Sequence, residues 1–201
     1  MPDSASSSRS HGAGRESDLD RLNLTAADVA STVQGVTVTR HLQSTSNPAV
    51  YAAGDAADTV GMPLTPIAVA EGKVAASNMI KSATVTPDYT GIPTAVFTLP
   101  ELARVGMLES EARQEGIDLD VRYTDTSRWY SNYRIGASTA ATKILIDRGS
   151  DRIVGAHLLG FEYAELINMI GLAIKLKIPA RQLKSAVAAY PTTGSDLGSM
   201  L

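Results

Sequence analysis

The sequence of 201 residues contains no cysteine, so this chain alone cannot form disulfides or carry out thiol-based redox chemistry. With only three scattered histidines as well, a zinc site is not expected. No apolar run is long enough to span a bilayer, and no secretory signal pattern opens the chain. The formal net charge of −3 gives no basic footprint for nucleic acid. These absences predict a cytoplasmic globular protein without metal, membrane or nucleic-acid partners.

The sequence also lacks the glycine-rich motif that binds dinucleotides and the serine motif that is typical of hydrolases. The nearest approach to G-x-G-x-x-G, Gly12-Ala13-Gly14, lies in a Ser- and Gly-rich stretch with no strand pattern before it. We therefore expect residues 1–16 to form a disordered tail. No G-x-S-x-G sequence indicates a hydrolase. The chain carries no dinucleotide-binding fingerprint of its own.

The most informative stretch follows residue 47. The apolar run over 50–53 ends at Gly54-Asp55 and predicts a short strand buried on both faces. Gly54 permits a sharp turn, and Asp55 places a carboxylate at the carboxyl end of the strand. Ligands bind at this edge in open α/β sheets, so the position suggests a site.

A helix is predicted directly after this turn. Pro63 and Pro66 favour its start, and the first turn of a helix has free N–H groups that point toward the same place. Small residues recur along this helix, and a mid-helix glycine, Gly72, costs about 1 kcal/mol relative to alanine. We therefore expect Gly72 to serve close packing against another backbone.

The remaining pattern predicts an α+β domain after a polar connection over 82–91. Before residue 47 the sequence shows a weak helical pattern over 17–31 and a strand pattern over 35–43. After residue 91 we expect strands at 94–98, 103–107, 118–126, 143–147 and 152–159, and helices at 109–115, 162–177 and 181–188. The helix at 162–177 is the clearest, because apolar residues line one face and its charges match the helix dipole.

The stretch around Gly54 resembles the second flavin-contacting segment of the pyridine nucleotide–disulfide oxidoreductases, the family of glutathione reductase, dihydrolipoyl dehydrogenase and mercuric reductase. In that family the Asp lies on the ribityl chain of FAD, and a Thr-Pro helix points its N-terminus at the flavin pyrimidine ring. The resemblance implies a cofactor-binding set made of Gly54, Asp55, Leu64, Thr65 and Pro66. A helix N-terminus suits this role because it stabilises negative charge on a reduced flavin.

The second half resembles the dimerisation domain of the same family. The residues that carry the resemblance are IPTAVFTLPELARVGMLESEA from Ile92 and DRIVGAHLLG from Asp151. The implied organisation is a tail at 1–16, a partial FAD-binding segment at 17–91 and a dimerisation domain at 92–201. The implied fold is α+β, with an antiparallel sheet and flanking helices, preceded by a strand-turn-helix remnant of an FAD-binding α/β domain.

The catalytic signature of the family, His-Pro-Thr followed after two residues by Glu, is altered here. Tyr190 stands at the His position and Ser195 at the Glu position, with Asp196 one step off. Tyrosine, with a pKa of about 10, is a poor base at neutral pH. Two interpretations of Tyr190 stay open: it marks a subgroup and takes part in catalysis, or it packs at the dimer interface.

Two other features have structural explanations that we prefer. His157 lies on a predicted hairpin strand and is expected to be a core histidine with a hydrogen-bond partner. The aromatic and basic segment 128–134 is expected to be a loop or dimer contact, since the acidic chain does not favour base stacking.

The resemblance implies the C-terminal part of an FAD-dependent NAD(P)H oxidoreductase, a homodimer that supplies dimer contacts and part of the flavin site. The alternative is a non-catalytic dimerisation module that does not bind FAD on its own. The redox cysteines, both dinucleotide-binding motifs (hence the NAD(P)H site) and the His/Glu dyad are absent. Enzymatic activity therefore stays open, and we expect FAD binding by this chain alone to be weak or absent. The electron acceptor and the choice of NADPH or NADH are not indicated.

Overall fold

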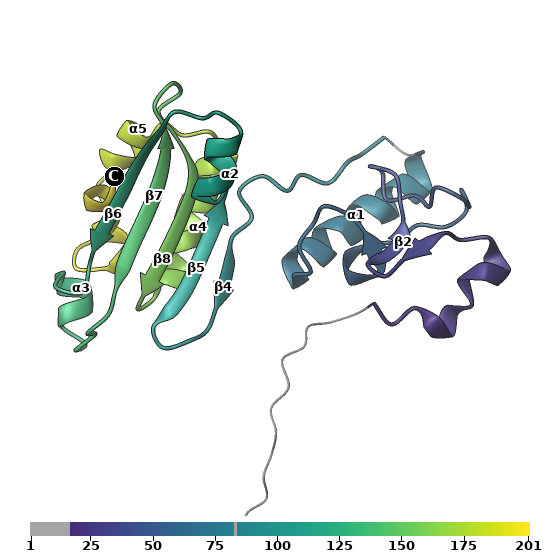
Figure 1. Ribbon diagram of the computed structural model, residues 1–201, viewed down its shortest axis with the longest axis horizontal. Coiled ribbons are helices and arrows are strands. Elements are labelled where there is room, and N and C mark those ends of the chain that lie inside the picture. The colour runs from purple at the N-terminus through teal and green to yellow at the C-terminus, as the bar shows by residue number, and fades with distance from the viewer. Residues whose placement is uncertain (1–16, 83) are drawn as a thin grey trace, which may run out of the picture. The chain divides into compact units, whose positions relative to one another are not determined.

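The computed structural model describes residues 17–82 and 84–201, which form two compact units (Figure 1). The first unit ends at Tyr89 and the second runs from Thr90 to Leu201. The tail predicted over 1–16 lies outside the described residues. Each unit is treated by itself below.

The first unit combines a small sheet with one long helix. Its sheet has the order β1-β2-β3, with β1 antiparallel and β3 parallel to β2. The elements are 3-10 helices at Asp20–Leu22, Leu24–Ala27 and Gly54–Ala56, strands β1 (Ser31–Thr32), β2 (Gly35–Thr37) and β3 (Ala57–Asp58), and helix α1 (Thr65–Lys81).

Three predictions of secondary structure are wrong in this unit. The helical pattern over 17–31 forms two short 3-10 helices, and the strand expected over 35–43 ends at Thr37. Residues 50–53 are half-buried and form only an isolated bridge between Tyr51 and Gln43, rather than a strand buried on both faces. The reason is local: this run bonds back onto its neighbours, through Ser44 N to Val50 O and Ala52 N to Leu42 O, and not to a sheet.

Helix α1 begins beside the predicted Pro66 and buries one face. Its buried residues, Ile67, Glu71, Ala75 and Asn78, recur every three or four positions, as an amphipathic helix requires. The prediction for Gly72 is wrong, because a Cβ built there meets nothing within 4 Å. Gly72 lies outside the buried face of this unit.

The second unit is a five-stranded antiparallel sheet of order β4-β5-β8-β7-β6 with helices on both faces (Figure 1). The strands are β4 (Thr94–Val96), β5 (Glu101–Gly106), β6 (Leu119–Asp125), β7 (Ala141–Asp147) and β8 (Arg152–Gly160). The helices are α2 (Glu109–Gln114), α3 (Tyr130–Tyr133), α4 (Tyr163–Lys175), α5 (Ala180–Lys184) and α6 (Leu197–Met200), with a 3-10 helix at Thr193–Asp196.

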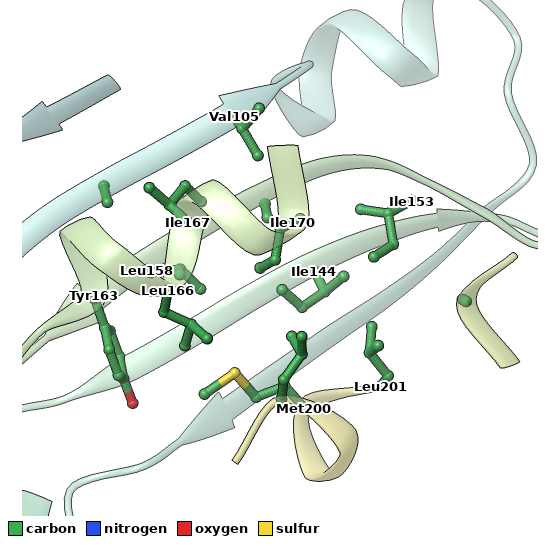
Figure 2. Packing of buried hydrophobic residues seen from close by; sticks show 14 of the residues in the cluster. Val105, Ile144, Ile153, Leu158, Tyr163, Leu166, Ile167, Ile170, Met200 and Leu201 are labelled. Carbon is green, nitrogen blue, oxygen red and sulfur yellow. The ribbon is translucent and has the colours of Figure 1, made fainter. Parts of the chain in front are cut away.

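The main core lies between the sheet and α4. Figure 2 shows side chains of α4 meeting strand residues such as Ile144 and Leu158, with Met200 and Leu201 closing one end. A smaller cluster packs Ala112 of α2 on the opposite face of the sheet, against Leu119 and Leu145. The predicted α+β fold with an antiparallel sheet is confirmed. The helix expected over 181–188 is shorter than predicted, because α5 ends at Lys184.

Among the described residues, no helix combines the length and apolar character needed to cross a membrane.

Candidate functional site

The Gly54-Asp55 turn lies directly against the start of α1. Gly54 has φ +62°, and a Cβ at this position would lie 2.7 Å from the Cβ of Ala68. Since Ala68 N donates to Leu64 O in the first turn of α1, the glycine turn and the helix start pack together. Both the backbone angle and the space require glycine here.

A buried carboxylate holds this turn in place. Glu71 of α1 is 1% exposed, and its Oε2 accepts the N–H of Gly54 at 2.6 Å. Its Oε1 accepts the hydroxyls of Thr59 at 2.9 Å and Tyr89 at 2.6 Å. Sequence reasoning missed Glu71 as part of this region. The signal was an acidic residue four positions after Ile67 and four before Ala75, on the apolar face of the helix.

The hydrogen bond from Tyr89 changes the acidity of that tyrosine. Burial and the neighbouring Glu71 carboxylate raise the pKa of Tyr89 to about 12. The phenol therefore stays protonated across the physiological range and donates to the carboxylate throughout.

A cavity of about 410 Å³ opens beside the turn. Gly54, Asp55, Pro63, Ile67 and Glu71 are among its lining residues. Asp55 is exposed, and the predicted Leu64, Thr65 and Pro66 sit at the N-terminal boundary of α1. Of the five predicted residues, Gly54 and Asp55 line the cavity, whereas Leu64, Thr65 and Pro66 lie at the adjacent helix start and are not among its lining residues. Chemically, this region offers a carboxylate for hydroxyl donors and helix N–H groups for carbonyl oxygens or negative charge.

The second predicted site surrounds Tyr190, which lies at the surface. The residue is 76% exposed, and its ring stacks on Tyr130 of α3, with centroids 6.3 Å apart and planes at 29°. The segment predicted as a loop or dimer contact, 128–134, therefore contains a short helix that supports the Tyr190 ring.

Ser195 does not act on Tyr190 in this arrangement. Its hydroxyl donates to Thr192 O at 2.6 Å, and its N–H donates to the Thr192 hydroxyl at 3.2 Å. These bonds close the turn that opens the 3-10 helix at Thr193–Asp196. The structure does not bring Tyr190 and Ser195 together as a hydrogen-bonded pair.

Neighbouring side chains anchor the same turn to the rest of the second unit. The Thr193 hydroxyl donates to Glu162 Oε2 at 2.9 Å, and the Ser131 hydroxyl donates to the Asp196 carboxylate. The carboxylate of Asp196, one position beyond Ser195, therefore accepts a hydrogen bond from Ser131 of α3. These hydrogen bonds join the turn to α3 and to Glu162, the residue before α4.

His157 behaves as a structural histidine. It is half-buried on β8, with Nε2 3.3 Å from Met107 O. Burial, with Lys143 and Arg104 nearby, lowers the pKa of His157. Within the part of the chain that the structure describes, no group of three or more His, Cys, Asp or Glu could hold a metal ion.

Comparison with known proteins places this geometry in a family. The profile of the pyridine nucleotide-disulphide oxidoreductase dimerisation domain matches residues 92–200. An uncharacterized 19.7 kDa protein in the mercuric resistance operon of Staphylococcus aureus is 46% identical over 180 residues, which are 90% of this chain and 100% of that protein. The mercuric reductase of Acidithiobacillus ferrooxidans is 34% identical over 182 residues, 89% of this chain.

The longer relatives are covered only in part. This chain spans 32% of the A. ferrooxidans mercuric reductase. The Cu(II) complex of the HOCl-induced flavoprotein disulfide reductase of Escherichia coli superposes with a TM-score of 0.85 at 24% identity, over 94% of this chain and 43% of that chain. This likeness shows a shared fold. Together with the match over 92–200, it follows that the chain belongs to the pyridine nucleotide-disulphide oxidoreductase family and contains its dimerisation domain.

Proposed function

We propose that the chain acts as a homodimer, joined through the second unit, and contributes one wall of an FAD site from the first unit. In this proposal it is the C-terminal part of an FAD-dependent NAD(P)H oxidoreductase of the disulfide-reductase family. Its partner is a second copy of the chain, and its setting is the cytoplasm. The family match over 92–200 and the partial coverage of longer reductases support this assignment.

The outward side of α4 is the observation that carries the proposal. This helix buries one face completely, yet Met169 and Leu172 on it and Leu176 directly after it are 43%, 56% and 61% exposed. Their spacing of three and four residues aligns them in one stripe. This apolar stripe lies beside the exposed Glu165, Asn168 and Lys175, as in a contact surface with a polar rim, and we expect a partner to cover it. A second copy of the same domain is the occupant that the family assignment favours.

The first unit fits part of a flavin. Asp55 would accept hydrogen bonds from ribityl hydroxyls, and the first turn of α1 would present N–H groups to the pyrimidine ring. Gly54 lets the turn pack directly against Ala68 of α1, which places Asp55 beside the helix start and on the lining of the cavity. When bound, FAD supplies reversible acceptance of a hydride from a nicotinamide. No Gly-rich turn in the sequence is suited to the pyrophosphate, so binding by this chain alone should be weak.

The dimer is tested by light scattering of the chain and of Leu172→Glu. We expect a dimer for the unchanged protein and a monomer for the variant, because a charge in an apolar interface is unfavourable. The matched control is Val69→Glu, which places the same charge at an exposed position of α1 in the first unit, and it should stay dimeric. A variant that remains as dimeric as the control would remove α4 from the interface.

The flavin contact is tested by absorbance titration with FAD. Asp55→Asn should weaken whatever binding the chain shows, while Asp58→Asn, the same change in β3 and outside the cavity beside the turn, should not. Equal effects of the two changes would contradict a specific role for Asp55.

A second candidate function is a dimerisation module that does not bind FAD on its own. The geometry near Tyr190 favours it, because Ser195 and Asp196 bond within the turn and to α3 instead of forming an acid–base pair. A colourless dimer that does not perturb added FAD would support this candidate.

A further inference from the structure

We propose that Glu71 is a positioning residue, whose buried carboxylate fastens both ends of the loop over 54–61 and thereby sets how Asp55 is presented. The flavin part of this inference rests on the proposed function. The conformational part concerns this chain alone and can be tested without a ligand.

The first end of the loop is held directly. Gly54 N donates to Glu71 Oε2 at 2.6 Å, and Asp55 is the next residue along the chain. Gly54 has a positive φ, begins the 3-10 helix at Gly54–Ala56 and packs against Ala68, so the bond to Glu71 adds to these local restraints. The bond to Glu71 restricts the orientation of the peptide between Ala53 and Gly54, one residue before Asp55.

The second end is held through a relay. Gly61 N donates to the Thr59 hydroxyl at 3.1 Å, and this hydroxyl donates to Glu71 Oε1 at 2.9 Å. A Cβ at Gly61 would lie 2.8 Å from Glu71 Oε1, so the chain passes close to the carboxylate at this end too. One side chain thus restrains the loop on both sides of Asp55.

Tyr89 completes the arrangement. Its hydroxyl donates to Glu71 Oε1 at 2.6 Å, and it is the last residue of the first unit. A carboxylate can accept several hydrogen bonds through its two oxygens, whereas an apolar side chain would leave the Gly54 N–H without its acceptor. This accounts for a Glu that is only 1% exposed on the buried face of α1.

Amide hydrogen exchange of the full chain without FAD tests the conformational part. In Glu71→Ala the Gly54 and Gly61 amides should exchange at least about tenfold faster, because both lose their restraint. In Thr59→Val only the Gly61 amide should accelerate. Glu71→Gln should restore most of the protection, since its oxygen can accept from Gly54 and the two hydroxyls can accept from its amide.

Asn78→Ala is the matched control. Asn78 is equally buried on α1, but its side chain bonds to the backbone of Thr84, Val85 and His41. Its loss should accelerate exchange near those residues and leave Gly54 and Gly61 unchanged. If Glu71→Ala leaves both glycine amides protected, or if Asn78→Ala exposes them equally, the inference is overturned.

FAD titration of the same variants separates this inference from the proposed function. If the unchanged chain perturbs the FAD spectrum, Glu71→Ala should weaken binding as much as Asp55→Asn, with rescue in Glu71→Gln. Binding by Glu71→Ala equal to that of the unchanged chain would overturn the positioning role while the proposed function stands. If the unchanged chain does not bind FAD, the flavin roles of both Asp55 and Glu71 fail together, and the exchange data alone decide whether Glu71 holds the loop.

Discussion

The two units are stabilised in different ways. Both apolar clusters lie in the second unit, where α4 and the strands contribute large aliphatic side chains. The first unit buries few apolar residues, several of them small: Val29, Val36, Leu42, Ala57, Ile67 and Ala75. In their place, Glu71 and Asn78 of α1 bind the backbone of surrounding loops. The second unit is a domain with its own core, whereas the first depends on specific hydrogen bonds that hold the loop over 54–61.

The largest expected effect on stability comes from a substitution in the core of the second unit. Ile170 is fully buried in α4, so Ile170→Ala should lower the free energy of unfolding of that unit by about 2–5 kcal/mol. The only tryptophan, Trp129, packs against this core, and its fluorescence in urea would follow the loss. Exposed Gln182→Ala should change the stability by less than about 0.5 kcal/mol. Equal midpoints for the two variants would contradict an apolar core centred on α4.

In the first unit the largest effect should come from a polar residue. Glu71→Leu keeps an apolar bulk on the buried face but removes the acceptor of Gly54, Thr59 and Tyr89. Each donor left buried costs about 1–3 kcal/mol, so the first unit should be strongly destabilised. Far-UV circular dichroism should then show an earlier transition while Trp129 fluorescence keeps its midpoint. A variant as stable as the unchanged protein would mean that apolar packing governs both units.

Two glycines in the first unit should respond in opposite directions. Gly54→Ala should destabilise by about 1 kcal/mol or more, because its φ is +62° and the added Cβ meets Ala68. Gly72→Ala should stabilise by about 0.5–1 kcal/mol, since the position is helical and open. Thermal unfolding of both variants measures the difference. Destabilisation by Gly72→Ala would indicate a close neighbour at that position.

The smallest expected effect is the dependence of stability on the ionisation of Tyr89. The pKa of Tyr89 is raised to about 12, above the ordinary value of about 10, so the folded state holds this proton more tightly than the unfolded state. The stability that Tyr89 contributes is therefore complete below about pH 10 and is lost as pH rises through about 12. Ultraviolet titration should show a tyrosinate step near pH 12 that Tyr89→Phe removes. A step that persists in the variant would assign it to another tyrosine.

The second unit follows its sequence closely because its elements are periodic. The helix predicted over 162–177 is α4 at Tyr163–Lys175, and the hairpin strands predicted before it are β7 and β8. Their apolar pattern and their burial agree, so local preference and tertiary packing point the same way. The C-terminal part of this unit is predicted less well. Helix α5 ends at Lys184, where the apolar pattern contains no signal that a helix should end.

The first unit shows where pattern reading fails. The apolar run over 50–53 predicts a buried strand, yet its backbone forms hydrogen bonds with residues 42–44. This pairing depends on the turn at Asn47 and not on the apolar content of the run. The turn at Gly54 and the helix start were predicted from residue types alone. Glu71 was not, because a charged residue on a helix is normally read as exposed, and its three donors come from separate segments of the chain.

The central claim is that the second unit joins two copies of the chain. Sedimentation velocity of the unchanged protein over a range of concentrations tests it most directly. The account predicts a species of twice the chain mass of 21.1 kDa that persists on dilution. A single species of 21.1 kDa at every concentration would contradict it.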